Sequence, residues 1–122
     1  MGPIWIALGA LFCALSIAAG AFGAHGLKTR LDADSLILWE TAARYFMYSG
    51  LGLVLIGLTT LNSFRRGFDV AALCLFLGGL VFSGTVAALA FSSPRWLGAI
   101  TPIGGLLMIV GFLVFAGTAL RL

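Results

Sequence analysis

Uncharged, mainly apolar stretches alternate with short charged clusters along this chain. Four windows contain no Asp, Glu, Lys or Arg: residues 1–27, 45–64, 70–94 and 96–120. A helix of about 20 residues crosses a hydrocarbon core of roughly 30 Å, so each window can hold one transmembrane helix. We therefore predict membrane spans at about residues 4–23, 45–62, 70–91 and 99–120.

Helices fit these windows better than transmembrane strands. The strands of a membrane barrel alternate polar and apolar positions, whereas these windows are apolar throughout. An Arg or Lys at a helix centre costs about 2.5–3.5 kcal/mol on insertion scales, so the lack of charge in four windows is a strong joint signal. The sequence predicts an all-α membrane protein, with residues 1–122 forming a single domain built as a four-transmembrane-helix bundle.

The segment between the first two predicted spans is too long for a turn and has an apolar side. Asp34 or Ser35 can accept a backbone hydrogen bond at its start, as helix-capping residues do. Glu40 and Arg44 stand four residues apart, which is the spacing of an ion pair on a helix. We predict an amphipathic interfacial helix over about residues 34–44.

The composition agrees with a membrane protein. Of the 122 residues, 61% are hydrophobic and 9% are charged, and the mean hydropathy is +1.15. The net charge of +3 comes from basic residues near membrane ends, and no basic stripe with interleaved aromatic residues indicates nucleic-acid binding. Cys13 and Cys74 lie inside apolar windows without metal-ligand spacing, so we expect no metal and no cofactor.

The positions of the basic residues bear on topology. No Lys or Arg precedes the first apolar run, and that run is longer than a usual signal core, so we predict a retained helix. Four spans place both termini on one side of the membrane. The basic residues are nearly balanced between the two sides, but Arg65 and Arg66 share one short loop on the side of the termini. We therefore predict that the termini are cytoplasmic.

Small residues recur at helical spacing in the first and third predicted spans. Helices in lipid associate through close van der Waals contact, which small residues permit. The first span has rows at Ala10, Ala14 and Ala18 and at Ser16, Gly20 and Ala24, and the third pairs Gly79 with Ser83 and Gly84 with Ala88. We predict that these two spans pack closely and that the packing residues are Gly20, Gly23, Gly26, Gly79, Ser83 and Gly84. Gly26 is also expected to end the first helix in a left-handed conformation.

Ionisable groups gather on the membrane face that carries the first and third loops. The helix centres contain no titratable side chain, which disfavours a proton relay or a voltage sensor. His25, the single histidine, can bind the free carbonyls at the end of the first helix, or it can shuttle a proton or bind a phosphate. Thr101 can cap the fourth helix. The candidate polar cluster at this interface comprises His25, Glu40, Arg44, Tyr48, Arg95 and Thr101.

Four stretches together resemble one known family. They are GAFGAHGLK at 20–28, WETAARYFMY at 39–48, FSGT at 82–85 and RWLGAITPIGG at 95–105. The chain resembles domain-of-unknown-function family 423, which comprises the YgdD-like small four-span membrane proteins. The resemblance implies a multi-pass protein of the bacterial plasma (inner) membrane and implies no activity. Many relatives have a second histidine where this chain has Ser49, which argues against a two-histidine site here.

Three hypotheses about function remain open. The first is a non-enzymatic bundle that acts as a lipid-contacting or accessory (assembly) subunit. The second is a small transporter or channel subunit that works as an oligomer, with Ser83 and Thr85 lining a path. The third is an interfacial enzyme in which Glu40 orients His25 as a general base, although no nucleophile is evident. We favour the first and expect no enzymatic activity. The expected partners are membrane lipids and a homo-oligomer or a larger membrane complex, without nucleic acid.

Overall fold

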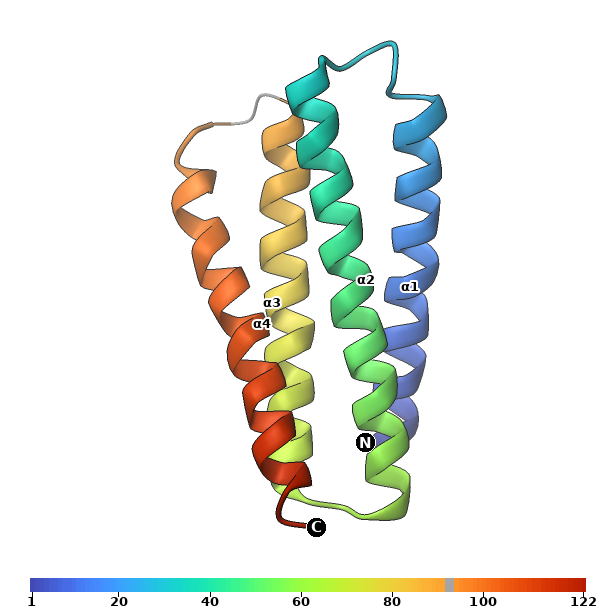
Figure 1. The fold of residues 1–122 in the computed structure, drawn as a ribbon, viewed down its shortest axis with the longest axis vertical. Coiled ribbons are helices and arrows are strands. Elements are labelled where there is room, and N and C mark those ends of the chain that lie inside the picture. The colour runs from blue at the N-terminus through green and yellow to red at the C-terminus, as the bar shows by residue number, and fades with distance from the viewer. Residues whose placement is uncertain (92–93) are drawn as a thin grey trace.

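Four long helices make up the computed structural model, which describes residues 1–91 and 94–122 (Figure 1). They are α1 (Gly2–His25), α2 (Ala33–Asn62), α3 (Arg66–Ala90) and α4 (Leu97–Ala119). Each is long and apolar enough to cross a membrane. Both termini lie at one end of the bundle, and the α1–α2 and α3–α4 connections lie at the other. The predicted all-α membrane architecture with four spanning helices is confirmed.

The four helices stand in an open row. α1 packs on α2, α2 on α3 and α3 on α4, so the two outer helices do not close the row into a ring (Figure 1). In the most apolar window of each helix, 39% of residues are buried in α2 and 44% in α3, against 22% in α1 and 17% in α4. The outer helices therefore present most of their surface to their surroundings.

Small residues spaced seven apart form the contact of α1 with α2. The buried small residues of α1 are Gly2, Gly9, Ser16 and Gly23. A Cβ atom on Gly9 would lie 2.5 Å from the carbonyl oxygen of Gly50, and one on Gly57 would lie 2.7 Å from that of Gly2. A seven-residue repeat keeps one helix face against its partner along the whole contact. The two backbones touch because these positions have little or no side chain.

The contact of α3 with α4 follows the same rule. A Cβ atom on Gly78 would lie 2.8 Å from the carbonyl oxygen of Gly104. Gly111 stands seven residues further along α4 and lies against the side chain of Leu75. Nearer the α3–α4 connection, the hydroxyl groups of Thr85 and Thr101 are 2.6 Å apart and share a hydrogen bond. Glycine contacts and this hydroxyl pair therefore hold the fourth helix.

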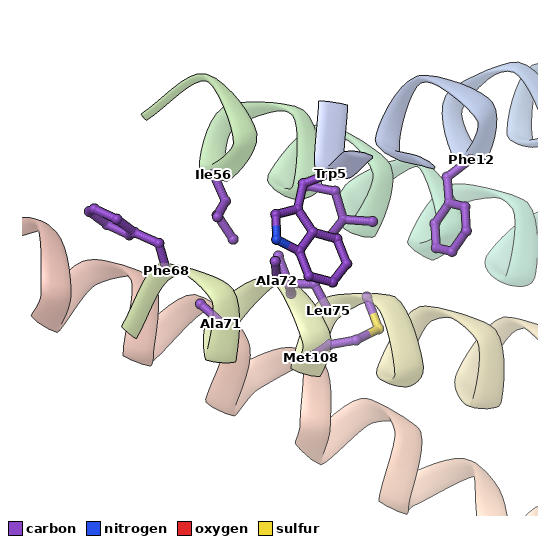
Figure 2. Packing of buried hydrophobic residues seen from close by; sticks show 9 residues of the cluster. Trp5, Phe12, Ile56, Phe68, Ala71, Ala72, Leu75 and Met108 are labelled. Carbon is purple, nitrogen blue, oxygen red and sulfur yellow. The ribbon is translucent and has the colours of Figure 1, made fainter. Parts of the chain in front are cut away.

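Most of the large buried side chains gather in the half of the bundle that carries the termini, whereas Leu27, just after α1, is buried at the other end. Trp5 and Phe12 extend from α1 towards α3, and Met108 comes from α4 (Figure 2). The remaining members of the cluster are Leu53, Ile56, Phe68, Ala71, Ala72 and Leu75. In this half, bulky side chains from α1 fill the space between α1 and α3.

The prediction that the first and third spans pack closely is wrong. α1 and α3 both pack on α2, and they meet through long side chains: the Trp5 indole donates to Asp69 at 2.9 Å, and the rings of Phe12 and Phe76 stack at 5.5 Å. The predicted row of Ala10, Ala14 and Ala18 is exposed. The seven-residue row of α1 allows closer backbone approach because three of its four members are glycines.

The separate interfacial helix predicted over residues 34–44 is also wrong. This segment is the first part of α2, a single helix of 30 residues. No Gly or Pro interrupts residues 33–49, so nothing in the sequence ends the helix there. At 1.5 Å per residue, α2 is about 45 Å long and extends beyond a hydrocarbon core of about 30 Å. Its cap is Asp32, which accepts a hydrogen bond from the Ser35 N–H at 2.8 Å, rather than Asp34 or Ser35.

Two further local predictions are wrong. Gly26 has φ −78° and ψ −37°, which is right-handed, so α1 ends without a left-handed glycine. Thr101 does not cap the last helix, because α4 begins at Leu97. The Thr101 hydroxyl instead donates to the Leu97 carbonyl, one turn earlier in the helix, at 3.1 Å.

Candidate functional site

The structure does not join the predicted interfacial cluster into one network. His25, Glu40, Arg44, Tyr48 and Arg95 are all exposed, and Thr101 is half-buried. Within residues 1–91 and 94–122, no hydrogen bond or ion pair links any two of the six, and the predicted Glu40–Arg44 pair is not formed. His25 makes no hydrogen bond to this part of the chain; Ser92 and Ser93 of the third loop lie outside the described residues. A binding role for the cluster stays a prediction.

The six predicted packing residues differ in their surroundings. A Cβ atom on Gly23 would lie 2.6 Å from the Trp39 ring, and one on Gly79 would lie 2.6 Å from the Ser49 hydroxyl oxygen. By contrast, a Cβ atom on Gly20 or Gly84 would have nothing within 4 Å. Gly26 faces the ring of Phe22 in its own turn, and Ser83 is buried. Gly20 and Gly84 therefore make no tight helix contact within the chain.

A groove of about 320 Å³ lies between α1, α2 and α3, in the half of the bundle nearer the α1–α2 connection. We call it the lateral groove. Two stripes with helical spacing form its α2 floor and its α3 wall, and a shorter stretch of α1 forms the opposite wall. The lining residues are Leu15, Ser16 and Ala19 of α1, Trp39, Ala42, Ala43 and Phe46 of α2, and Leu80, Ser83, Gly84 and Ala87 of α3.

Aromatic side chains narrow both ends of the lateral groove. Towards the termini, Phe12 stacks on Phe46 with ring centroids 4.0 Å apart and on Phe76 with ring centroids 5.5 Å apart. Towards the connection, Trp39 makes edge contacts with Phe22 at 6.3 Å and Phe91 at 5.7 Å. The side of the groove is open.

The rim of the lateral groove faces the surroundings of the bundle. Leu15 on the α1 wall is 50% exposed, and Leu80 on the α3 wall is 43% exposed. Both residues lie within membrane-spanning helices. The opening therefore faces the position of the lipid chains rather than either aqueous side.

Most polar atoms of the groove are already paired. The Ser16 hydroxyl donates to the Ala43 carbonyl at 2.5 Å, and the Trp39 indole N–H donates to the Ala19 carbonyl at 2.7 Å. These bonds also join α1 to α2. The Ser83 hydroxyl is buried and has no hydrogen-bond partner among the described residues. The lateral groove is thus an apolar space with one unpaired hydroxyl at its wall.

The lining suits binding of a hydrocarbon better than acid–base chemistry. None of the eleven lining residues is a His, Cys, Asp, Glu, Lys or Arg. A general base and the carboxylate that orients it are joined by a hydrogen bond. His25 and Glu40 form no such bond. Among the described residues, no group of three His, Cys, Asp or Glu side chains is placed to hold a metal ion.

Sequence reasoning names part of this lining, but for other reasons. Ser16, Ser83 and Gly84 belong to predicted packing rows, and Trp39, Ala43 and Phe46 belong to the apolar side of the predicted interfacial helix. The spacing of Trp39, Ala42, Ala43 and Phe46 does mark one face of a helix. The sequence does not show that this face lies opposite the α3 stripe, because that depends on how the helices pair.

Comparison with known proteins places the chain in a family. The model of a family described as "Protein of unknown function (DUF423)" matches residues 19–105, which include nine of the eleven groove residues. This chain belongs to the DUF423 family. It is 47% identical over 111 residues to a UPF0382 membrane protein of Staphylococcus haemolyticus, covering 91% of this chain and 90% of the relative. The DUF423 chain is thus an integral, multi-pass membrane protein.

Further relatives match over nearly their whole length. A UPF0382 membrane protein of Staphylococcus epidermidis is 44% identical over 118 residues, with 97% of this chain and 96% of the relative covered. One of Staphylococcus aureus is 40% identical over 111 residues, with 91% and 90% covered. No solved structure matches this DUF423 chain.

Proposed function

We propose that this DUF423 protein is a non-enzymatic, lipid-contacting membrane protein that holds a lipid hydrocarbon chain in its lateral groove. The supporting observation is the shape of the groove, which is apolar, narrowed by aromatic rings at both ends and open towards the lipid. A lipid chain is the apolar molecule present in excess at that opening.

The size of the groove supports part of a hydrocarbon chain as its occupant. Its volume of about 320 Å³ is roughly twice that of a 150 Å³ apolar cavity that stays dry and binds benzene. Moving from bulk lipid into the groove changes little in hydrophobic free energy, because both surroundings are apolar. Binding therefore depends on van der Waals contact with the walls, which favours a chain of matching shape.

The charged face above the groove supports binding of a lipid rather than of a free hydrocarbon. Lys28, Arg44 and Arg95 are exposed on the side of the α1–α2 and α3–α4 connections. Arginine and lysine at this depth pair with lipid phosphates. The predicted interfacial cluster then contributes to holding the headgroup of a lipid whose chain enters the groove.

The open row of helices favours one second candidate, an accessory (assembly) subunit. α1 and α4 expose most of their apolar surface, which a partner helix can cover. In that case a side chain of the partner fills the lateral groove. A transporter or channel gains no such support from the single chain, since the groove opens sideways and Thr85 is bonded to Thr101.

Filling the groove tests the proposal. Gly84→Phe places a ring in the opening, where a Cβ atom meets nothing within 4 Å. The control is Gly98→Phe, at an equally open glycine in the first turn of α4. Lipids that remain bound after purification in mild detergent are quantified by mass spectrometry. We expect Gly84→Phe to lower lipid retention roughly tenfold, equivalent to about 1.4 kcal/mol, and Gly98→Phe to leave it unchanged.

Other outcomes of this experiment would contradict the proposed lipid site. Retention unchanged in Gly84→Phe, or lowered equally in both variants at unchanged helix content, rules out the lateral groove as the lipid site. Loss of a co-purifying transmembrane protein in Gly84→Phe, at unchanged lipid content, supports the assembly subunit instead.

A further inference from the structure

A second hollow lies at the opposite end of the bundle, where α3 begins and α4 ends. Its volume is about 460 Å³. We call it the terminal hollow. The lining residues are Arg66, Gly67 and Val70 of α3, and Val114, Gly117, Thr118 and Arg121 beside and along the end of α4. It shares no residue with the lateral groove, so a ligand can bind there whether or not the lateral groove is occupied.

The lining changes from charged to apolar with depth in the membrane. Arg66 is the first residue of α3, and Arg121 follows the end of α4. At 1.5 Å per residue, Val70 lies about 6 Å deeper than Arg66, and Val114 lies about 10 Å deeper than Arg121. A phospholipid has the same profile, with a charged phosphate at the surface and hydrocarbon below it.

Small residues leave the terminal hollow unfilled. Gly67 lies directly against the side chain of Thr118, so α3 and α4 approach closely at this level. A Cβ atom on Gly117 would meet nothing within 4 Å. The space beside Gly117 is therefore free for a ligand.

The charges around the terminal hollow favour an anion. The N-cap of α3, Arg65, gives no side-chain hydrogen bond to the helix, so no capping side chain covers the positive end of α3. Asp69, the acidic residue in the first turn of α3, is not part of the lining and accepts a hydrogen bond from Trp5 of α1. The lining thus carries two guanidinium groups and no carboxylate.

We propose that the terminal hollow binds the phosphate of an anionic phospholipid. Arg66 and Arg121 pair with the phosphate oxygens, since guanidinium groups bind phosphate with two parallel hydrogen bonds. The Thr118 hydroxyl is placed to donate a further hydrogen bond. Val70 and Val114 contact the first part of the lipid chains. Basic hollows between membrane helices bind such headgroups in other proteins.

Native mass spectrometry of the full chain in detergent tests this site. Phosphatidylglycerol, phosphatidylcholine and diacylglycerol are titrated separately. We expect phosphatidylglycerol to bind roughly tenfold more tightly than the other two lipids. The double variant Arg66→Gln/Arg121→Gln should lose this preference. Arg65→Gln removes the same charge from the neighbouring residue, which lies outside the lining, and should keep the preference.

A second variant tests the shape of the hollow while both arginines remain. Gly117→Leu fills the free space and should also abolish the preference, whereas Gly98→Leu at the other end of the bundle should not. If the double variant does not fold, Gly117→Leu still tests whether phosphatidylglycerol binds in the terminal hollow. Circular dichroism reports folding of each variant.

Three results would overturn the proposal. One is a phosphatidylglycerol preference that survives both the double variant and Gly117→Leu. Another is an equal loss in Arg65→Gln, which indicates diffuse attraction to the whole charged face. The third is displacement of the lipid by an equal concentration of inorganic phosphate, which indicates a site for the free anion.

Discussion

At the scale of single residues, the surroundings of each glycine decide its role. Gly9 lies against the backbone of α2 at Gly50, whereas Gly20, on the same helix, has open space beside it. The sequence marks both as small residues in an apolar helix. It does not show which one faces a neighbour.

Exchange of these two glycines for alanine should have opposite effects. In Gly9→Ala the new Cβ lies 2.5 Å from the Gly50 oxygen, so α1 and α2 must separate. We expect a loss of about 1–3 kcal/mol, as for overpacking of a core. Gly20→Ala meets nothing within 4 Å and should gain about 0.5–1 kcal/mol from higher helix propensity. Thermal unfolding in detergent measures both, and shifts of the same sign would contradict this account.

At the scale of helices, the continuity of α2 is the main departure from the predicted arrangement. The segment before the second span has an apolar face, and a lipid surface is one partner for such a face. In the structure the partner is α1, because Trp39 lies against Gly23 and donates to the Ala19 carbonyl. The same pattern of apolar residues suits either partner, and tertiary contact with α1 decides between them.

The start of α2 should depend on Asp32 and on pH. The Ser35 backbone N–H lowers the pKa of the Asp32 carboxyl below its usual value by hydrogen bonding to the charged form. A lowered pKa in the folded state means that the cap stabilises α2 above the unfolded pKa and is lost as the pH falls through the folded pKa. Asp32→Ala should raise hydrogen exchange in the first turn of α2 at neutral pH.

Asp34→Ala is the matched control for this prediction. Asp34 is also an exposed acid at the start of α2, but it is not the cap. Exchange measured by mass spectrometry should rise more in Asp32→Ala than in Asp34→Ala. Equal increases would show that charge near the helix end, rather than the capping hydrogen bond, protects the first turn.

At the scale of the whole molecule, few contacts join α1 directly to α3. α1 reaches α3 through the Trp5–Asp69 hydrogen bond and the Phe12–Phe76 stack, both outside the lateral groove. The gap between α1 and α3 is filled where these side chains meet. It stays open as the lateral groove further along the helices.

Removal of the indole donor should therefore destabilise the whole bundle. Trp5→Phe keeps an aromatic ring but leaves the Asp69 carboxylate without the indole hydrogen bond. We expect a loss of about 1.5–3 kcal/mol, which is typical of a hydrogen bond to a charged group. Trp96→Phe, at a residue that is 63% exposed, should change stability little. Both are measured by thermal unfolding in detergent, and equal effects would exclude a special role of the Trp5–Asp69 bond.

The sequence alone determined that four helices span a membrane, because a charge in lipid is costly and the charges mark the helix ends. It also placed Ser83 and Gly84 among the residues of interest, although for packing. The pairing of helices was decided by the tertiary structure, since several small-residue rows compete and only backbone contact distinguishes the seven-residue row of α1. The lateral groove and the terminal hollow follow from that pairing, because each is a space between helices whose side chains are too small to fill it.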